Sequence, residues 1–196
     1  NALPDAVLRL TLTRGPGPRG YSPKGADKPT LVLALHPLPA TKPRGLRLIT
    51  SSFRVVADDP LAQVKTCSKL LHVLARAEAD GQRADDALLL NTRGQIAETT
   101  SSNIFWFSGD VLMTPAKWTG ALMGITRTTV FALANQLGLE CGEVDDDPRA
   151  LRSATGVFLT NSVHGLVEAV ALDGHGLRRS PFTASLIEAR GERRVA

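Results

Sequence analysis

A lysine that precedes the first strongly helical segment of the chain could act as a nucleophile. Lys65 lies in "LAQVKTCSK", three residues before a stretch whose apolar residues recur at helical spacing. Lysine side chains are rarely buried, so residue statistics favour a solvated lysine in a loop. The alternative is an amine that is held in a pocket because it does chemistry.

A glutamate followed by small polar residues is the second candidate for chemistry. Glu98 lies in "QIAETTSSNIF", directly before the polar run from Thr99 to Asn103. Taken alone, Glu98 is typical of an exposed strand residue. The polar run, however, offers several hydroxyl groups and a backbone that a polar ligand could approach closely.

Two further segments could bind an anion. In "LMGITRTTV", Gly124, Ile125 and Thr126 stand at a predicted helix start, where free backbone N–H groups and the helix dipole favour a phosphate. A plain threonine N-cap is the alternative there. In "TNSVHG", Ser162 follows a predicted strand and either binds phosphate or lies in a turn.

A loop rich in glycine and proline could recognise a carboxylate. The segment "RGPGPRGYS" contains Arg14, Arg19 and Tyr21. A guanidinium group can bind a carboxylate through two hydrogen bonds, so the loop suits an acidic ligand. A solvated surface arginine is the alternative.

Strands outnumber helices among the elements that must position these residues. We expect strands at residues 6–14, 30–38, 45–53, 86–91, 95–107, 110–114, 138–144, 155–161 and 166–174. We expect helices at residues 68–80, 125–138, 145–154 and 181–194. In the first helix the expected apolar face consists of Leu70, Leu71, Leu74 and Ala77 and ends at Glu78. Residues 15–29 form a loop and residues 39–44 a linker. The pattern predicts an α+β fold around one barrel-like or strongly twisted sheet.

The composition excludes several classes of protein. The chain has 196 residues, of which 43% are hydrophobic and 21% charged, as in an ordinary globular protein. The formal net charge of +4 is scattered, which argues against nucleic acid and suits a small anionic ligand. No apolar run is long enough to span a bilayer. Two cysteines and four histidines show no metal-ligand spacing, so we expect no metal site and a cytoplasmic protein.

The order of these motifs resembles that of the fold-type IV pyridoxal-phosphate enzymes. This family includes branched-chain aminotransferases, D-amino-acid aminotransferases and 4-amino-4-deoxychorismate lyases. The similar segments are "VKTCSKLLHVLARAEA", "ADDALLLNTRGQIAETTSSNIFWF", "VLMTP" and "MGITR", within residues 61–173. The segment "LTLTRGPGPRGYSP" is especially similar to the lyase branch, although "TRG" followed by "PR" also occurs in D-amino-acid aminotransferases. Leu70 stands where branched-chain enzymes carry tyrosine, which favours the other branches.

The resemblance implies a D-amino-acid aminotransferase-like fold with two domains. Residues 1–40 would be the remainder of a small N-terminal α/β domain, and residues 41–58 the interdomain connection with the first strand of the large domain. Residues 59–196 would form the large, cofactor-binding domain, in a homodimer. The first residue is Asn1, and we expect a further segment before it, with an arginine that holds the cofactor phosphate.

The resemblance also implies a role for each candidate residue. Lys65 matches the lysine that binds pyridoxal phosphate as a Schiff base and then serves as a mobile general base. Glu98 matches the glutamate that faces the pyridine nitrogen and keeps it protonated. The phosphate would be bound by Ile125, Thr126 and Ser162, and a substrate carboxylate by Arg19, with Tyr21 beside it.

Three functions follow from the resemblance. The first is an aminodeoxychorismate lyase, which would release p-aminobenzoate and pyruvate for folate biosynthesis. The second is an aminotransferase that acts on D- or branched-chain amino acids and needs a keto acid as acceptor. The third is a catalytically inactive relative that keeps only the fold. Lys65 and Glu98 serve both enzymes, so these two residues do not separate them.

Overall fold

The structure is a computed structural model that describes residues 5–39 and 45–192. The chain divides into two units, Asn1–Lys42 and Pro43–Ala196. Most of the linker predicted at residues 39–44, and the last two residues of the helix predicted at 181–194, lie outside the described residues.

The first unit contains an antiparallel pair of strands. Strand β1 (Ala6–Thr13) pairs with β2 (Thr30–Pro37) along its whole length, from Ala6 opposite Pro37 to Thr13 opposite Thr30. Both strands were predicted, the first from the alternation of apolar and polar residues at 6–14. The glycine- and proline-rich loop lies between them and carries Arg19 and Tyr21.

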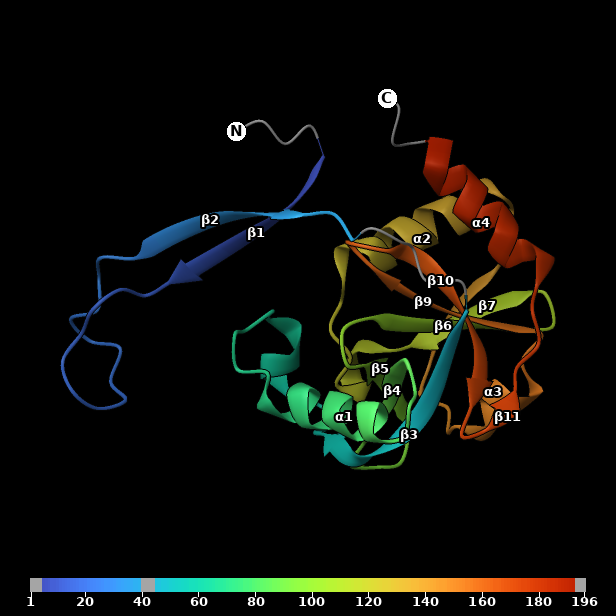
Figure 1. The fold of residues 1–196 in the computed structure, drawn as a ribbon, viewed down its shortest axis with the longest axis horizontal. Coiled ribbons are helices and arrows are strands. Elements are labelled where there is room, and N and C mark those ends of the chain that lie inside the picture. The colour runs from blue at the N-terminus through green and yellow to red at the C-terminus, as the bar shows by residue number, and fades with distance from the viewer. Residues whose placement is uncertain (1–4, 40–44, 193–196) are drawn as a thin grey trace. The chain divides into compact units, whose positions relative to one another are not determined.

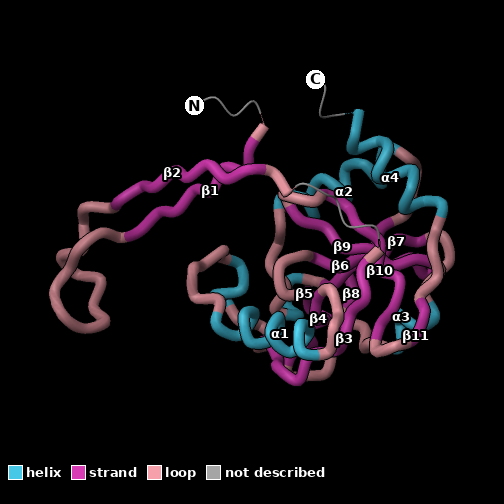
Figure 2. The backbone as a smooth tube through the Cα atoms, viewed as in Figure 1, coloured by secondary structure: helices cyan, strands magenta, loops and turns pink. Residues whose placement is uncertain are grey.

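The second unit is built on a curled mixed sheet, which Figures 1 and 2 show with its helices. Within residues 45–192 the sheet has nine strands in the order β5-β4-β3-β10-β9-β6-β7-β8, with β11 beside β10. Three pairs are parallel, β3–β4, β3–β10 and β7–β8, and the others are antiparallel. The strands are β3 (Leu46–Val55), β4 (Asp86–Asn91), β5 (Ile96–Thr99), β6 (Asn103–Ser108), β7 (Val111–Pro115), β8 (Cys141–Val144), β9 (Gly156–Asn161), β10 (Gly165–Leu172) and β11 (His175–Gly176).

Helices cover the sheet. They are α1 (Leu70–Gly81), α2 (Ile125–Gln136), α3 (Arg149–Ser153) and α4 (Pro181–Glu192), with short 3-10 helices η1 (Pro60–Gln63) and η2 (Lys117–Thr119). Helix α1 lies against β3 and β4, whereas α2 contacts α4 and β9 (Figure 1). The predicted α+β fold with a mixed sheet and surrounding helices is confirmed.

The central strands are buried on both faces. In β6, Ile104 and Trp106 pack into one core cluster with β4 and α3, while Phe105 and Phe107 pack into another with α2 and α4. Side chains alternate between the faces of a strand, so a strand between two cores needs an apolar residue at nearly every position. This explains why "DALLLN" and "NIFWF" are continuous runs rather than alternating ones.

The predicted buried face of the first helix is wrong except at Leu71, which is partly buried and packs against the core. Leu70 and Leu74 are 70% and 41% exposed, whereas Ala75 and Ala79 are fully buried. The two alanines pack against β3, β4 and β5, where small side chains let the helix approach the sheet closely. Leucines and alanines both recur at helical spacing along α1, so periodicity alone could not tell which stripe faces the sheet. The helix also begins at Leu70 rather than at residue 68.

Hydrogen bonds to the Glu78 carboxylate connect α1 to β3. The Ser51 hydroxyl donates to Glu78 at 2.7 Å, and the Ser52 backbone N–H donates to the same oxygen at 3.0 Å. The Ser51 hydrogen bond and the backbone hydrogen bond from Ser52 lower the pKa of Glu78 below its ordinary value. The contact therefore holds the helix that follows Lys65.

No membrane span and no metal cluster emerge from the described part of the chain. None of its helices is long and apolar enough to cross a membrane. Nor do residues 5–39 and 45–192 contain a group of three or more histidine, cysteine, aspartate or glutamate side chains that could hold a metal ion.

We predict that Ser51→Ala destabilises the protein by about 1–2 kcal/mol near neutral pH, because it removes the strongest hydrogen bond to the Glu78 carboxylate. Since folding lowers the pKa of Glu78, its contribution is complete above pH 4.5, the ordinary value, and is lost as the pH falls through the folded pKa. Urea unfolding at pH 7 and pH 4 measures both effects.

Ser52→Ala is the comparison variant, because it keeps the backbone N–H that binds Glu78 and removes only the weaker interaction of the Ser52 side chain, so we expect a smaller loss of stability. Equal losses of stability in the two variants would contradict this account.

Candidate active site

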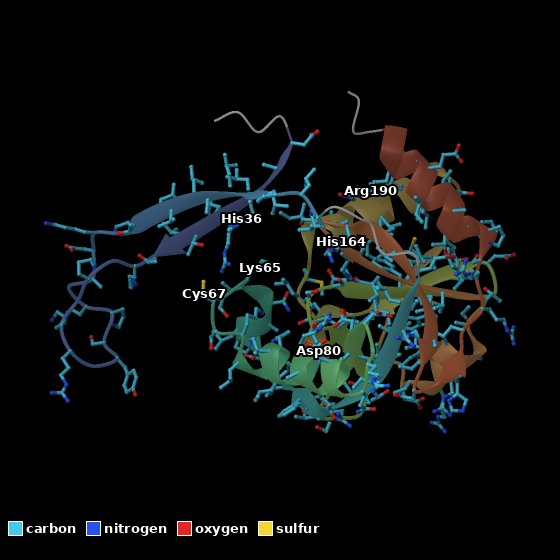
Figure 3. The ribbon with its side chains drawn as sticks, viewed as in Figure 1. His36, Lys65, Cys67, Asp80, His164 and Arg190 are labelled. Carbon is cyan, nitrogen blue, oxygen red and sulfur yellow. The ribbon has the colours of Figure 1, made fainter. Side chains whose placement is uncertain are left out.

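Five of the seven predicted site residues line one cavity. It has a volume of about 280 Å³ and is lined by Lys65, Glu98, Ile125, Thr126 and Ser162, among others. Its walls come from four segments that are distant in sequence: the loop before α1, the turn between β5 and β6, the loop before α2 and the end of β9. Figure 3 shows Lys65 on the segment that precedes α1.

The polar run after Glu98 forms a turn rather than one long strand. The predicted strand at residues 95–107 is split into β5 and β6, with residues 100–102 between them. The backbone N–H of Thr99 donates to the Ser102 carbonyl at 2.9 Å, and the Thr100 hydroxyl donates to the buried carboxylate of Asp86 at 2.5 Å. The turn places Glu98 near the end of one strand and Asn103 at the start of the next.

Glu98 is buried, so its interpretation as an exposed strand residue is wrong. The residue is only 8% exposed. One carboxylate oxygen lies 3.0 Å from His72 Nε2, and the other accepts a hydrogen bond from the Leu122 backbone N–H at 3.0 Å. Both oxygens therefore have a polar neighbour that is held by a separate element.

Leu122 connects Glu98 to the start of α2. While its N–H donates to Glu98, its carbonyl accepts hydrogen bonds from Asn103 Nδ2 at 2.6 Å and from the Gly124 N–H at 2.9 Å. The Glu98 carboxylate and the start of α2 are therefore both held by hydrogen bonds to the backbone of Leu122.

The start of α2 has the properties of an anion site. Gly124 is the N-cap residue and makes no side-chain hydrogen bond, so the threonine N-cap considered above does not form. The first N–H groups of a helix lack intrahelical acceptors, and those of Ile125 and Thr126 are at the cavity. Across the cavity Thr160 is buried, and its hydroxyl oxygen has no hydrogen-bond partner. A phosphate oxygen would satisfy these donors.

Two lysines lie at the cavity. Lys65 is exposed in the loop after η1, and Lys69 is half-buried at the N-cap of α1. Both side chains line the same cavity, and a lysine amine can serve there as a nucleophile or as a cation. The arrangement can therefore attach a carbonyl compound and attract a second anionic group.

Sequence reasoning missed the supporting residues of the site. His72 was considered only among the four histidines that show no metal-ligand spacing, Asn103 only as the end of a polar run, and Lys69 was given no role. The backbone N–H of Leu122 leaves no mark in a sequence, because every residue except proline has one. The i+3 spacing of Lys69 and His72 on one helix was the signal that could have indicated a shared face.

Arg19 and Tyr21 are not among the residues that line the cavity. Both are exposed in the loop between β1 and β2 of the first unit. Because they belong to a different unit from the cavity, their assignment to a substrate carboxylate stays a prediction.

Comparison with known proteins decides the family. The model of the family described as amino-transferase class IV matches residues 1–172. The chain belongs to this family. A Methanocaldococcus jannaschii protein named as a branched-chain-amino-acid aminotransferase is 36% identical over 176 residues, which are 89% of this chain. The chain spans only 61% of that protein's length.

Solved structures confirm the fold of this class IV chain. The 4-amino-4-deoxychorismate lyase of Pseudomonas aeruginosa superposes with a TM-score of 0.90 at 30% identity, covering 97% of this chain and 72% of the lyase. An aminotransferase from Brucella abortus, solved with bound PLP, has a TM-score of 0.80 at 26% identity, over 87% of this chain and 62% of that one. The predicted fold-type IV, D-amino-acid aminotransferase-like fold is confirmed.

We predict that Gly124→Ala destabilises the protein by about 1–3 kcal/mol. The φ of Gly124 is −68°, which alanine adopts freely, but an added Cβ would meet Asn103 Oδ1 at 2.3 Å. Asn103 would have to move, and its hydrogen bond to the Leu122 carbonyl would be lost. Denaturant unfolding measures the change.

Gly81→Ala is the control, because an added Cβ there meets nothing within 4 Å. We expect it to leave stability unchanged or slightly higher, since alanine favours a helix. If both variants were equally stable, Asn103 would not constrain the start of α2.

Proposed function

We propose that the cavity binds pyridoxal 5'-phosphate and that the whole protein is an aminodeoxychorismate lyase. The chain covers less than two thirds of the relative reported above, so its activity is inferred from the large domain and from family membership. The residues at the cavity carry the proposal.

The residues present fit the cofactor. The free N–H groups of Ile125 and Thr126, together with Ser162 and the unpartnered Thr160 hydroxyl, would hold the phosphate. Glu98 would face the pyridine nitrogen, because its carboxylate lines the same cavity. When bound, the cofactor supplies an electron sink for the carbon next to the substrate amine.

Lys65 and Glu98 would divide the proton chemistry between them. The Lys65 amine is the point of covalent attachment and, once a substrate amine displaces it, a base that removes a proton from the carbon bearing that amine. The negative charge of Glu98 would favour a proton on the ring nitrogen. The lyase reaction then expels the enolpyruvyl group as pyruvate and leaves an aromatic ring, with no second amino acid consumed.

The residues that line the cavity are mostly of polar or charged types, which supports the lyase. Aminodeoxychorismate carries two carboxylates, whereas a branched-chain amino acid needs room for an apolar side chain. Among the described residues, apart from glycine, the apolar side chains at the cavity are those of Leu122, Met123 and Ile125. The single observation that carries the proposal is Lys69, a second cation beside Lys65 that suits a dianionic substrate.

An aminotransferase is the second candidate. Its support is the 36% identity to the Methanocaldococcus jannaschii protein, which exceeds the identity to the Pseudomonas lyase. Such an enzyme would use the same Lys65 and Glu98 and would return the proton to the cofactor instead of expelling a leaving group.

We also propose that the protein is a homodimer in the cytoplasm. Several large apolar side chains on η1, the following loop and α1 are exposed, namely Leu61, Val64, Leu70 and Val73. Exposed apolar side chains that gather on one part of a surface often mark an interface. Light scattering of the full-length protein would measure the mass directly.

We predict that the full-length protein with pyridoxal phosphate converts aminodeoxychorismate without any keto acid. p-Aminobenzoate, followed by fluorescence, and pyruvate, followed by a coupled assay, should appear in equal amounts. Lys65→Ala should lose the activity, because the attachment point and the base disappear together.

Turnover that begins only after an amino acid and 2-oxoglutarate are added would make the protein an aminotransferase. A protein that shows no absorbance band of a lysine-bound cofactor would be an inactive relative.

We predict that Lys69→Gln raises KM for aminodeoxychorismate by about 10-fold or more, because a charge-assisted contact to a carboxylate is lost. The absorbance of the bound cofactor should stay unchanged, since Lys65 remains. Lys69→Arg keeps the positive charge and should stay near the wild-type value. An unchanged KM in Lys69→Gln would remove the main support for a dianionic substrate.

A further inference from the structure

His72 makes a contact with the buried carboxylate that the proposed chemistry does not yet use. It stands on the first turn of α1, and its side chain is 16% exposed. Its Nε2 atom lies 3.0 Å from Glu98 Oε1, and the residue lines the cavity. Helix α1 thus supplies a polar group directly to the carboxylate on β5.

The second ring nitrogen of His72 indicates which group carries the proton. Nδ1 is buried and has no hydrogen-bond partner. A positively charged imidazole would bury an unpaired N–H there, which costs more than leaving an acceptor unpaired. The favoured form is therefore the neutral ring with its proton on Nε2, donating to Glu98.

The other oxygen of Glu98 leads to the same assignment. The Leu122 backbone N–H can only donate, so Glu98 Oε2 accepts from it. With His72 donating to Oε1, the carboxylate receives one N–H at each oxygen. Two donors, one from α1 and one from the loop before α2, therefore fix its plane.

We propose that His72 is a positioning residue that holds the Glu98 carboxylate oriented toward the ring nitrogen of the cofactor. This inference rests on the proposed cofactor site. A carboxylate held in that orientation presents its negative charge to the ring nitrogen, which favours a proton there. His72 thereby acts on the cofactor through Glu98.

The test measures the protonation of the cofactor rather than activity. Full-length protein is loaded with pyridoxal phosphate labelled with ¹⁵N at the ring, and the ¹⁵N chemical shift is recorded together with the cofactor Kd. His72→Leu removes the donor. His72→Gln restores one, because its amide nitrogen can reach the position of Nε2.

We expect His72→Leu to move the ¹⁵N signal toward the unprotonated ring and to weaken cofactor binding by about 10- to 100-fold. His72→Gln should recover most of both changes. Ala77→Gln, on the same helix and exposed, is the control and should behave as wild type.

A wild-type ¹⁵N signal in His72→Leu would overturn the proposal, even if the cofactor bound more weakly, because a purely structural role would change affinity alone. If the leucine variant folds poorly, His72→Asn replaces it, since its shorter amide stays polar but falls short of Glu98.

Glu98→Gln separates this inference from the cofactor site itself. If the wild-type protein shows no lysine-bound cofactor, the proposed function fails. If Glu98→Gln shifts the ¹⁵N signal and His72→Leu does not, the cofactor site stands and the role of His72 is wrong.

Discussion

The hydrogen bonds of the Leu122 backbone are the contacts on which the rest of the site depends. Its N–H is directed to Glu98, and its carbonyl accepts from Asn103 and from the Gly124 N–H at the start of α2. A ligand with a basic ring at one end and an anion at the other needs both ends held at a constant separation. Leu122 provides that constraint, because hydrogen bonds hold the peptide groups on both sides of its Cα.

The loop that carries Leu122 is in turn supported by the sheet. Asn91, the last residue of β4, donates through Nδ2 to the Thr119 carbonyl at 3.1 Å. Gly120 follows with a φ of +92°, and an added Cβ there would meet the Val56 carbonyl oxygen at 2.5 Å. The loop can pass this close to β3 only because the residue is glycine. Strands that are buried on both faces therefore fix a loop that has no regular structure of its own.

Much of this arrangement could be predicted from the sequence, and the exceptions have physical causes. The strands follow from apolar runs and alternation, and Gly138, with a φ of +69°, lies just past the end of α2 in a conformation that favours glycine. The resemblance placed Lys65, Glu98 and Thr126 in one site, and the structure does bring them to one cavity. The orientation of α1 was wrong, since periodicity defines a stripe but not its partner. The contacts of Glu98 were missed because one donor is a backbone group and the other, His72, approaches from a separate element.

The residues that define the cofactor chemistry are not the residues that select a reaction. In the proposed chemistry Lys65 acts on the carbon beside the substrate amine and Glu98 on the ring nitrogen of the cofactor, so both would be equally useful to a lyase and to an aminotransferase. Selection requires groups that meet the rest of the substrate, and Lys69 is a charged side chain at the cavity with no assigned part in the cofactor chemistry. A cation there lowers the free energy of a bound substrate that has a second carboxylate. It raises the free energy of a bound substrate with an apolar side chain, because that side chain would remove water from the cation. The choice between the two reactions would therefore depend on the charge of Lys69, which binds the substrate. The proton chemistry of Lys65 and Glu98 would be the same in both.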